Sequence, residues 1–174
     1  MVFWARLTAM LSLADRLRPH WPLVSLMFSA AMLATAHLYF QRILGLQPCP
    51  LCLDQREWHW GVVGVSLLAL LVVRVKAPLS RWMALLIGLV LLASAAMGAY
   101  HVAVEQHWVT AQCDANIDPN DIRPLDFSEP LEVPRCDEIA WTLGGISMAG
   151  WNALASLLMA LASFAVAALP ERKP

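Results

Sequence analysis

Charged side chains are unevenly distributed along the chain, and four long stretches contain none. Asp, Glu, Lys and Arg are absent from residues 21–41, 58–73, 82–104 and 139–169. About 20 apolar residues are enough to cross a bilayer as a helix. The last stretch is longer than a crossing needs, so its first residues are expected outside the hydrocarbon. The pattern predicts four membrane spans, at about residues 21–41, 57–74, 82–104 and 147–169.

The fold class follows from the lipid that would surround these four segments. A backbone polar group left unpaired in lipid is costly, so apolar segments of this length are expected to be helices. The composition agrees, because 59% of the residues are hydrophobic and 14% are charged, whereas about a quarter is charged in a typical soluble domain. We therefore expect an all-α, polytopic membrane protein with one domain, a four-helix transmembrane bundle.

The first 20 residues do not resemble a signal peptide. Arg6 interrupts the apolar run, and Asp15, Arg16 and Arg18 follow it before the first span. The apolar residues of this segment have helical spacing, at Phe3, Leu7, Met10, Leu11, Ala14 and Leu17. Residues 1–20 are therefore predicted to form an amphipathic helix at the membrane surface.

Basic residues predict the orientation. Four spans place both termini, including the tail 170–174, on the same side as the loop between the second and third spans. That side carries eight basic residues, Arg6, Arg16, Arg18, Arg74, Lys76, Arg81, Arg172 and Lys173, and the other side carries Arg42, Arg56, Arg123 and Arg135. Because basic residues favour the cytoplasm, both termini are expected there. The first loop, 42–56, and the long second loop, 105–146, then face the opposite side.

All four cysteines fall in these two loops: Cys49 and Cys52 in the first, Cys113 and Cys136 in the second. A compartment outside the cytoplasm permits disulfides. Two structural disulfides in a membrane scaffold without enzymatic activity would satisfy this arrangement, and so would four unpaired thiols. The local sequence around each cysteine has to separate these alternatives from redox chemistry.

The first pair stands at a predicted helix start. Cys49 can be the N-cap residue, with Pro50 at the first helical position that proline favours and Cys52 in the first turn. A helix N-terminus and a Cys-x-x-Cys motif both favour the reactive thiolate, so the pair is interpreted as redox-active. Arg56 lies one turn after Cys52 on the same face. It can stabilise a thiolate or bind the carbonyl oxygen of an acceptor, or it can simply extend to the headgroups.

Metal and haem sites are alternatives for the same residues. Structural zinc sites usually need four ligands, which would recruit the distant Cys113 and Cys136, so no metal is expected. Four-helix bundles can bind haem through paired histidines, and His37, His59 and His101 lie in or near spans. That reading leaves the four cysteines unexplained, so no haem is expected.

The second loop is far longer than a connection between neighbouring helices needs. It has a formal charge of minus six from Gln106 to Glu138. A disulfide between Cys113 and Cys136 would close its middle part, and reduction would release it, which suits exchange with a docked protein. The apolar residues that follow, Ile139 to Leu143, are expected to form a short turn on the membrane surface.

Several segments in a fixed order resemble one known family. They are Pro48-Cys49-Pro50-Leu51-Cys52-Leu53-Asp54-Gln55-Arg56, Gly98-Ala99-Tyr100-His101, Cys136-Asp137-Glu138-Ile139-Ala140-Trp141 and Ser147-Met148-Ala149-Gly150-Trp151-Asn152. Over nearly the whole chain the sequence resembles the DsbB family of bacterial inner-membrane thiol oxidoreductases. It departs from the best-known relatives between the second pair of cysteines, the part expected to set partner fit.

The resemblance implies a route for electrons. Cys113 would form a mixed disulfide with a periplasmic thiol oxidase like DsbA, and Cys136 would be its loop partner. Electrons would pass by exchange to Cys49 and Cys52, which would form the other disulfide. From the Cys52 thiolate they would pass to bound ubiquinone or menaquinone and so to the respiratory quinone pool. Arg56 and His101 would border the quinone.

The resemblance also implies a location, the bacterial inner membrane, with every cysteine on the periplasmic side. Lipid is an expected partner and nucleic acid is not. Glu138 and Trp141 match the family but receive no chemical role. An enzyme like vitamin K epoxide reductase is the related alternative, although a motif that precedes the second span fits the DsbB pattern better.

Overall fold

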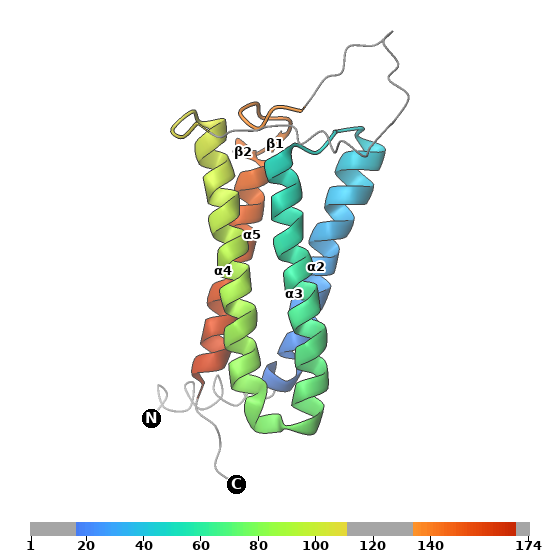
Figure 1. The fold of residues 1–174 in the computed structure, drawn as a ribbon, viewed down its shortest axis with the longest axis vertical. Helices are drawn as coiled ribbons and strands as arrows, with labels where there is room; N and C mark the ends of the chain where they lie inside the picture. Colours follow the sequence, from blue (N-terminus) through green and yellow to red (C-terminus); the bar gives the residue numbers. More distant parts are fainter. Residues whose placement is uncertain (1–16, 111–133, 170–174) are drawn as a thin grey trace, which may run out of the picture.

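The computed structural model describes residues 17–110 and 134–169. In this part of the chain, four long helices form an elongated bundle (Figure 1). The elements in chain order are η1 (Arg18–His20), α2 (Trp21–Ala34), η2 (Thr35–Ile43), α3 (Pro50–Val75), η3 (Ala77–Leu79), α4 (Ser80–Glu105), β1 (Thr142–Leu143), β2 (Ile146–Ser147) and α5 (Met148–Ala168). The first long helix comprises η1, α2 and the π-helical η2, and all four are long and apolar enough to cross a membrane. The predicted all-α bundle is confirmed, whereas most of the amphipathic segment 1–20 and the tail 170–174 lie outside the described residues.

Small residues allow the helices to approach closely, as is common where helices pack in lipid. A side chain at Gly98 of α4 would come within 3.0 Å of the Ala153 backbone nitrogen and 3.1 Å of the Ala149 carbonyl oxygen of α5. Backbone atoms cannot move aside, so this crossing requires glycine. The two helices lie side by side in Figure 1.

The bundle has two dissimilar halves. Towards the α3–α4 connection, Val62, Ala69, Ile87, Leu91 and Ala160 form a fully buried apolar cluster. Towards the opposite end, where α3 and α5 begin, the interior contains polar side chains and both described cysteine sites. We call the first the apolar half and the second the cysteine half.

A small hairpin precedes α5 and differs from the predicted surface turn. Thr142 pairs with Ser147 and Leu143 with Ile146 in an antiparallel register. Gly144 and Gly145 connect the strands with φ values of 60° and 80°, the left-handed conformation that tight hairpin turns require and glycine supplies. Ser147 then caps α5 by accepting a hydrogen bond from the Gly150 amide. The hairpin lies at the end of the bundle where α3 starts (Figure 1).

Candidate active site

The Cys-x-x-Cys pair begins α3 in the predicted way. Cys49 is the N-cap residue with an extended backbone, and Pro50 is at the first helical position. The Cys49 sulfur accepts a hydrogen bond from the Cys52 backbone amide at 3.2 Å. Both cysteines are free thiols, so the structure holds the pair in its dithiol form. The disulfide between them stays a prediction.

Cys49 does not have the low thiol pKa that is usual at a helix N-terminus. The side-chain hydrogen bond with Cys52, followed by burial, raises the pKa of the Cys49 thiol far above its usual range. The expectation that the helix start favours a thiolate was made for the pair, and it stays a prediction. At Cys49, the neighbouring thiol and burial outweigh the amide hydrogen bond.

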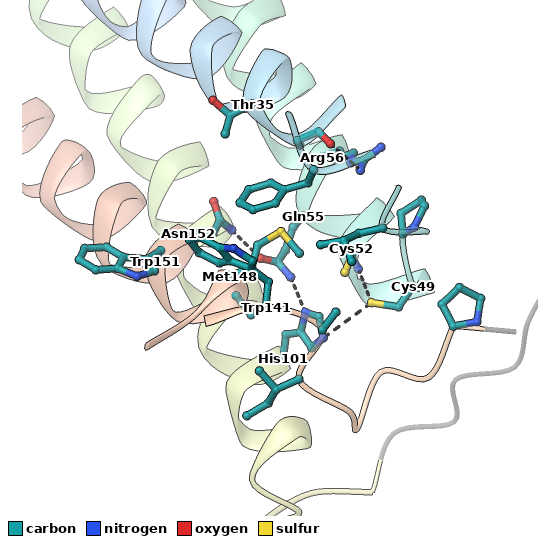
Figure 2. A pocket seen from close by; sticks show the side chains of 18 of the residues that line it. Thr35, Cys49, Cys52, Gln55, Arg56, His101, Trp141, Met148, Trp151 and Asn152 are labelled. Atoms are coloured by element: carbon teal, nitrogen blue, oxygen red, sulfur yellow. Dashed lines mark hydrogen bonds between the residues drawn. The ribbon is translucent and has the colours of Figure 1, made fainter. Parts of the chain in front are cut away.

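The thiols open onto a cavity of about 500 Å³ in the cysteine half. Its lining includes all four candidates of the first loop and the helices: Cys49, Cys52, Arg56 and His101. Helices α2 with η2, α3, α4 and α5 all contribute to the wall, together with the segment before the hairpin. Figure 2 shows these side chains converging on one space.

Arg56 is held inside the bundle by the π-helical segment η2. It donates one hydrogen bond to the Gln41 side-chain oxygen at 3.0 Å and another to the Ala36 carbonyl at 3.3 Å. π-Helical geometry inside a long helix is often found at functional sites. The two bonds fix the guanidinium beside the cavity, which argues against an arginine that merely reaches for lipid headgroups.

His101 contacts the thiol pair directly. One ring nitrogen, Nε2, lies 3.7 Å from the Cys49 sulfur, and the other, Nδ1, lies 2.6 Å from the Gln55 amide nitrogen. Gln55 in turn accepts a hydrogen bond from Asn152 of α5 at 2.7 Å. Figure 2 shows this row of side chains ending at the sulfur. Gln55 and Asn152 were not predicted as site residues, although both stand in motifs that carry the family resemblance.

The second cysteine pair reaches the same place through Cys136. Cys136 is disulfide-bonded and 1% exposed. It packs in one buried cluster with Cys49, Leu51 and Val104, and its backbone forms a hydrogen bond with the His101 ring. Cys113 lies outside the described residues, so its pairing with Cys136 stays a prediction.

The residues around Cys136 complete the rim. Trp141 lines the cavity and packs edge-on against Phe40, with ring centroids 4.9 Å apart. Glu138 also lines it but is exposed and lies 3.4 Å from the Arg135 guanidinium. Glu105, which the sequence interpretation did not single out, is a buried carboxyl group of the same lining, bonded to the Ser147 hydroxyl.

Some of the same side chains could in principle ligate a metal ion or haem iron. The sulfurs of Cys49 and Cys52 and a ring nitrogen of His101 lie within 4.8 Å of one another, so they could bind a soft metal ion, one ligand short of the usual structural zinc set. His59 has both ring nitrogens engaged, Nδ1 with Ser29 at 3.2 Å and Nε2 with Asn152 at 2.8 Å. Those bonds would have to break before the ring could ligate haem iron.

Comparison with known proteins decides the family. Residues 18–166 match the family model described as disulfide bond formation protein DsbB. The chain belongs to the DsbB family. It is 36% identical over 151 residues to disulfide bond formation protein B of Pasteurella multocida, a match that covers 78% of this chain and 81% of that protein. The same-named proteins of Azoarcus and Marinobacter nauticus are 32% and 33% identical and cover 77% and 78% of the chain, which spans 84% and 83% of them.

Membership of the DsbB family makes this chain a multi-pass membrane protein of disulfide bond formation, with a disulfide oxidoreductase role. No solved structure matches the chain.

Proposed function

We propose that this protein is a thiol:quinone oxidoreductase that reoxidises a DsbA-like periplasmic dithiol protein. The observation that carries the proposal is the position of the Cys49/Cys52 dithiol, between a cavity on one side and the buried Cys136 on the other. A cysteine pair in this position can receive electrons from the second pair when it is a disulfide, and deliver them to an acceptor in the cavity when it is a dithiol.

The cavity fits a quinone head group. Binding cavities for small molecules usually have about 300 to 1,000 Å³ and apolar walls with a few polar groups. Here Phe40, Trp141 and Met148 supply apolar wall, and Arg56 supplies hydrogen-bond donors of the kind that carbonyl oxygens accept. A bound quinone would supply a two-electron acceptor beside the pair.

The protein's own residues account for the thiol chemistry. A partner thiolate would attack Cys113 of the Cys113–Cys136 disulfide, and the released Cys136 thiolate would attack Cys49 of the Cys49–Cys52 disulfide, which leaves Cys52 as the thiolate next to the cavity. The partner's second thiol would then close the partner's own disulfide and release Cys113, which would attack Cys136, restore the Cys113–Cys136 disulfide and release Cys49. The Cys49 and Cys52 thiols would finally form their disulfide again, with two electrons and two protons passing to the quinone. Cys136 lies in one buried cluster with Cys49, so the exchange needs no large rearrangement of the bundle.

Arg56 has two tasks in this scheme. Its bonds to η2 orient it, and its positive charge favours a negative sulfur one helical turn away. Sidedness follows from the basic residues: with cytoplasmic termini, the cysteine half faces the periplasm, where a DsbA-like partner would dock on the second loop.

Purified protein tests the proposal when it is mixed with a reduced DsbA-like dithiol and a short-chain ubiquinone. We expect the ubiquinone absorbance to fall in step with disulfide formation in the partner, and the Cys52→Ser variant to lose this activity. The proposal is contradicted if quinone is not consumed, or if Cys52→Ser consumes it at the same rate.

A further inference from the structure

A row of hydrogen-bonded polar side chains crosses the cysteine half and joins all four helices. It runs from Ser29 of α2 to His59 of α3, then to Asn152 of α5, Gln55 of α3 and His101 of α4. Every member is at least nine-tenths buried. Buried polar groups inside a membrane are costly and therefore usually have a function. The row ends at the Cys49 sulfur.

The direction of the hydrogen bonds is fixed at Gln55. Its amide nitrogen lies 3.2 Å from the Leu51 carbonyl oxygen, which can only accept. The same nitrogen lies 2.6 Å from His101 Nδ1. An amide NH₂ has two hydrogens, so it can donate both bonds. His101 Nδ1 is then an acceptor, and a neutral ring must carry its proton on Nε2.

The rest of the row has the same polarity. Gln55 presents its oxygen to the Asn152 amide nitrogen, which donates at 2.7 Å. The Asn152 oxygen accepts from His59 Nε2 at 2.8 Å, and the Ser29 hydroxyl can donate to His59 Nδ1 at 3.2 Å. Each donor thus points along the row towards Cys49. Turning the Gln55 amide over would place its oxygen against the Leu51 carbonyl oxygen, and two acceptors cannot bond. The orientation of Gln55 therefore fixes the orientation of its neighbours.

We propose that Gln55 and Asn152, supported by His59, are positioning residues that hold His101 as the Nε2–H tautomer, with this N–H directed at the Cys49 sulfur. The His101 ring also forms a hydrogen bond with the Cys136 backbone. His101 therefore lies at the point where the two cysteine pairs meet. The inference deepens the proposed function and rests on it for the chemical step below.

The His101 Nε2–H group stabilises the Cys49 sulfur when Cys49 becomes a leaving group. In the proposed exchange, the Cys113 thiolate attacks Cys136 in a Cys136–Cys49 mixed disulfide. The Cys113–Cys136 bond forms, the Cys136–Cys49 bond breaks, and the electron pair remains on the Cys49 sulfur. No other oxidant or reductant takes part. A hydrogen bond from an N–H group to the new thiolate lowers the barrier, whereas a bare ring nitrogen would repel it.

Nitrogen NMR of the full-length protein, labelled with ¹⁵N-histidine, reports the tautomer without partner or quinone. The His101 signals are assigned by their loss in His101→Gln. We expect protonated Nε2 and bare Nδ1 in the parent protein. In Gln55→Met, which keeps the length of the side chain and removes its donor, we expect a mixture of both tautomers. Asn152→Leu should cause a smaller shift in the same direction.

Ser163→Ala is the matched control, because it removes another buried bond between helices, the one from the Trp21 ring N–H to the Ser163 hydroxyl at 3.0 Å. It should leave the His101 tautomer and the exchange rate unchanged. Gln55→Met should slow single-turnover release of Cys49 from the mixed disulfide about tenfold, as expected for one hydrogen bond to a charged group.

Protonated Nδ1 in the parent protein would overturn the inference, and so would an unchanged tautomer in folded Gln55→Met. If that variant fails to fold, the parent spectrum and Asn152→Leu still decide. A parent protein with the expected tautomer that never reduces quinone would instead contradict the proposed function alone.

Discussion

The two halves of the bundle use buried space differently. In the apolar half, Val62, Ile87 and Leu91 are fully buried in direct contact, whereas the cysteine half leaves a cavity of about 500 Å³ and buries polar side chains beside it. Dense packing makes an interior rigid. The difference suggests that one half holds the helices in register so that the other can keep an open site with oriented hydrogen bonds.

This comparison predicts that substitutions in the apolar half affect stability and leave the chemistry intact. Leu91→Ala empties a fully buried position, and we expect it to lower the free energy of unfolding by about 2 kcal/mol. Denaturation in detergent measures the loss. The Michaelis constant for quinone should not change, because Leu91 does not line the cavity.

Leu92→Ala is the control for that substitution, since Leu92 is the next residue and is 41% exposed at the bundle surface. Leu92→Ala should lower the free energy of unfolding much less than Leu91→Ala does. Equal losses at both positions would mean that the apolar cluster is not the source of rigidity.

In the cysteine half the expected pattern is reversed, with altered binding and little change in stability. Arg56→Gln removes a charged donor from the cavity wall, so the Michaelis constant for quinone should rise about tenfold. Steady-state quinone reduction measures it. Arg74→Gln, an exposed substitution at the far end of the same helix, should have no effect. If Arg56→Gln lowers the free energy of unfolding but leaves the Michaelis constant for quinone unchanged, Arg56 does not bind the quinone.

A smaller effect distinguishes the sulfurs within the cysteine half. Because Cys52 raises the pKa of Cys49, Cys49 should stay protonated at a pH where an ordinary cysteine, with a pKa of about 8.5, is ionised. Alkylation of Cys49, followed by mass spectrometry in protein carrying Cys113→Ser and Cys136→Ser, should therefore be slow at neutral pH and accelerate only at a pH above that of an ordinary cysteine. Cys52→Ala should shift that acceleration to lower pH. A Cys49 that reacts like a free thiol would show that the contact with Cys52 does not control it.

The halves also differ in how far the sequence predicts them. Absence of charge from four stretches is enough to predict four helices, because lipid leaves the backbone few alternatives. Pro50 after Cys49 likewise predicts the cap of α3, since proline favours the first helical position. The hairpin was not predicted, because the residues before the fourth span were assigned only a short surface turn, although Gly144-Gly145 is a recognised turn signal.

The contacts of the site depend on how the helices are rotated about their axes, which no local pattern determines. Gln55, His59 and Asn152 look like isolated polar residues in three predicted spans, and only the packed bundle brings them into one row. Similarly, the raised pKa of Cys49 depends on the hydrogen bond with the Cys52 side chain and then on burial, which a capping argument does not include.

The central claim is that the Cys49/Cys52 pair itself delivers electrons to a quinone in the adjacent cavity. It is tested most directly with protein in which Cys113 and Cys136 are serine, reduced, freed of reductant and mixed with ubiquinone. We expect one quinol for each Cys49–Cys52 disulfide formed, and none from the same protein with Cys49→Ser. Thiols that remain reduced while ubiquinone stays oxidised would contradict the account.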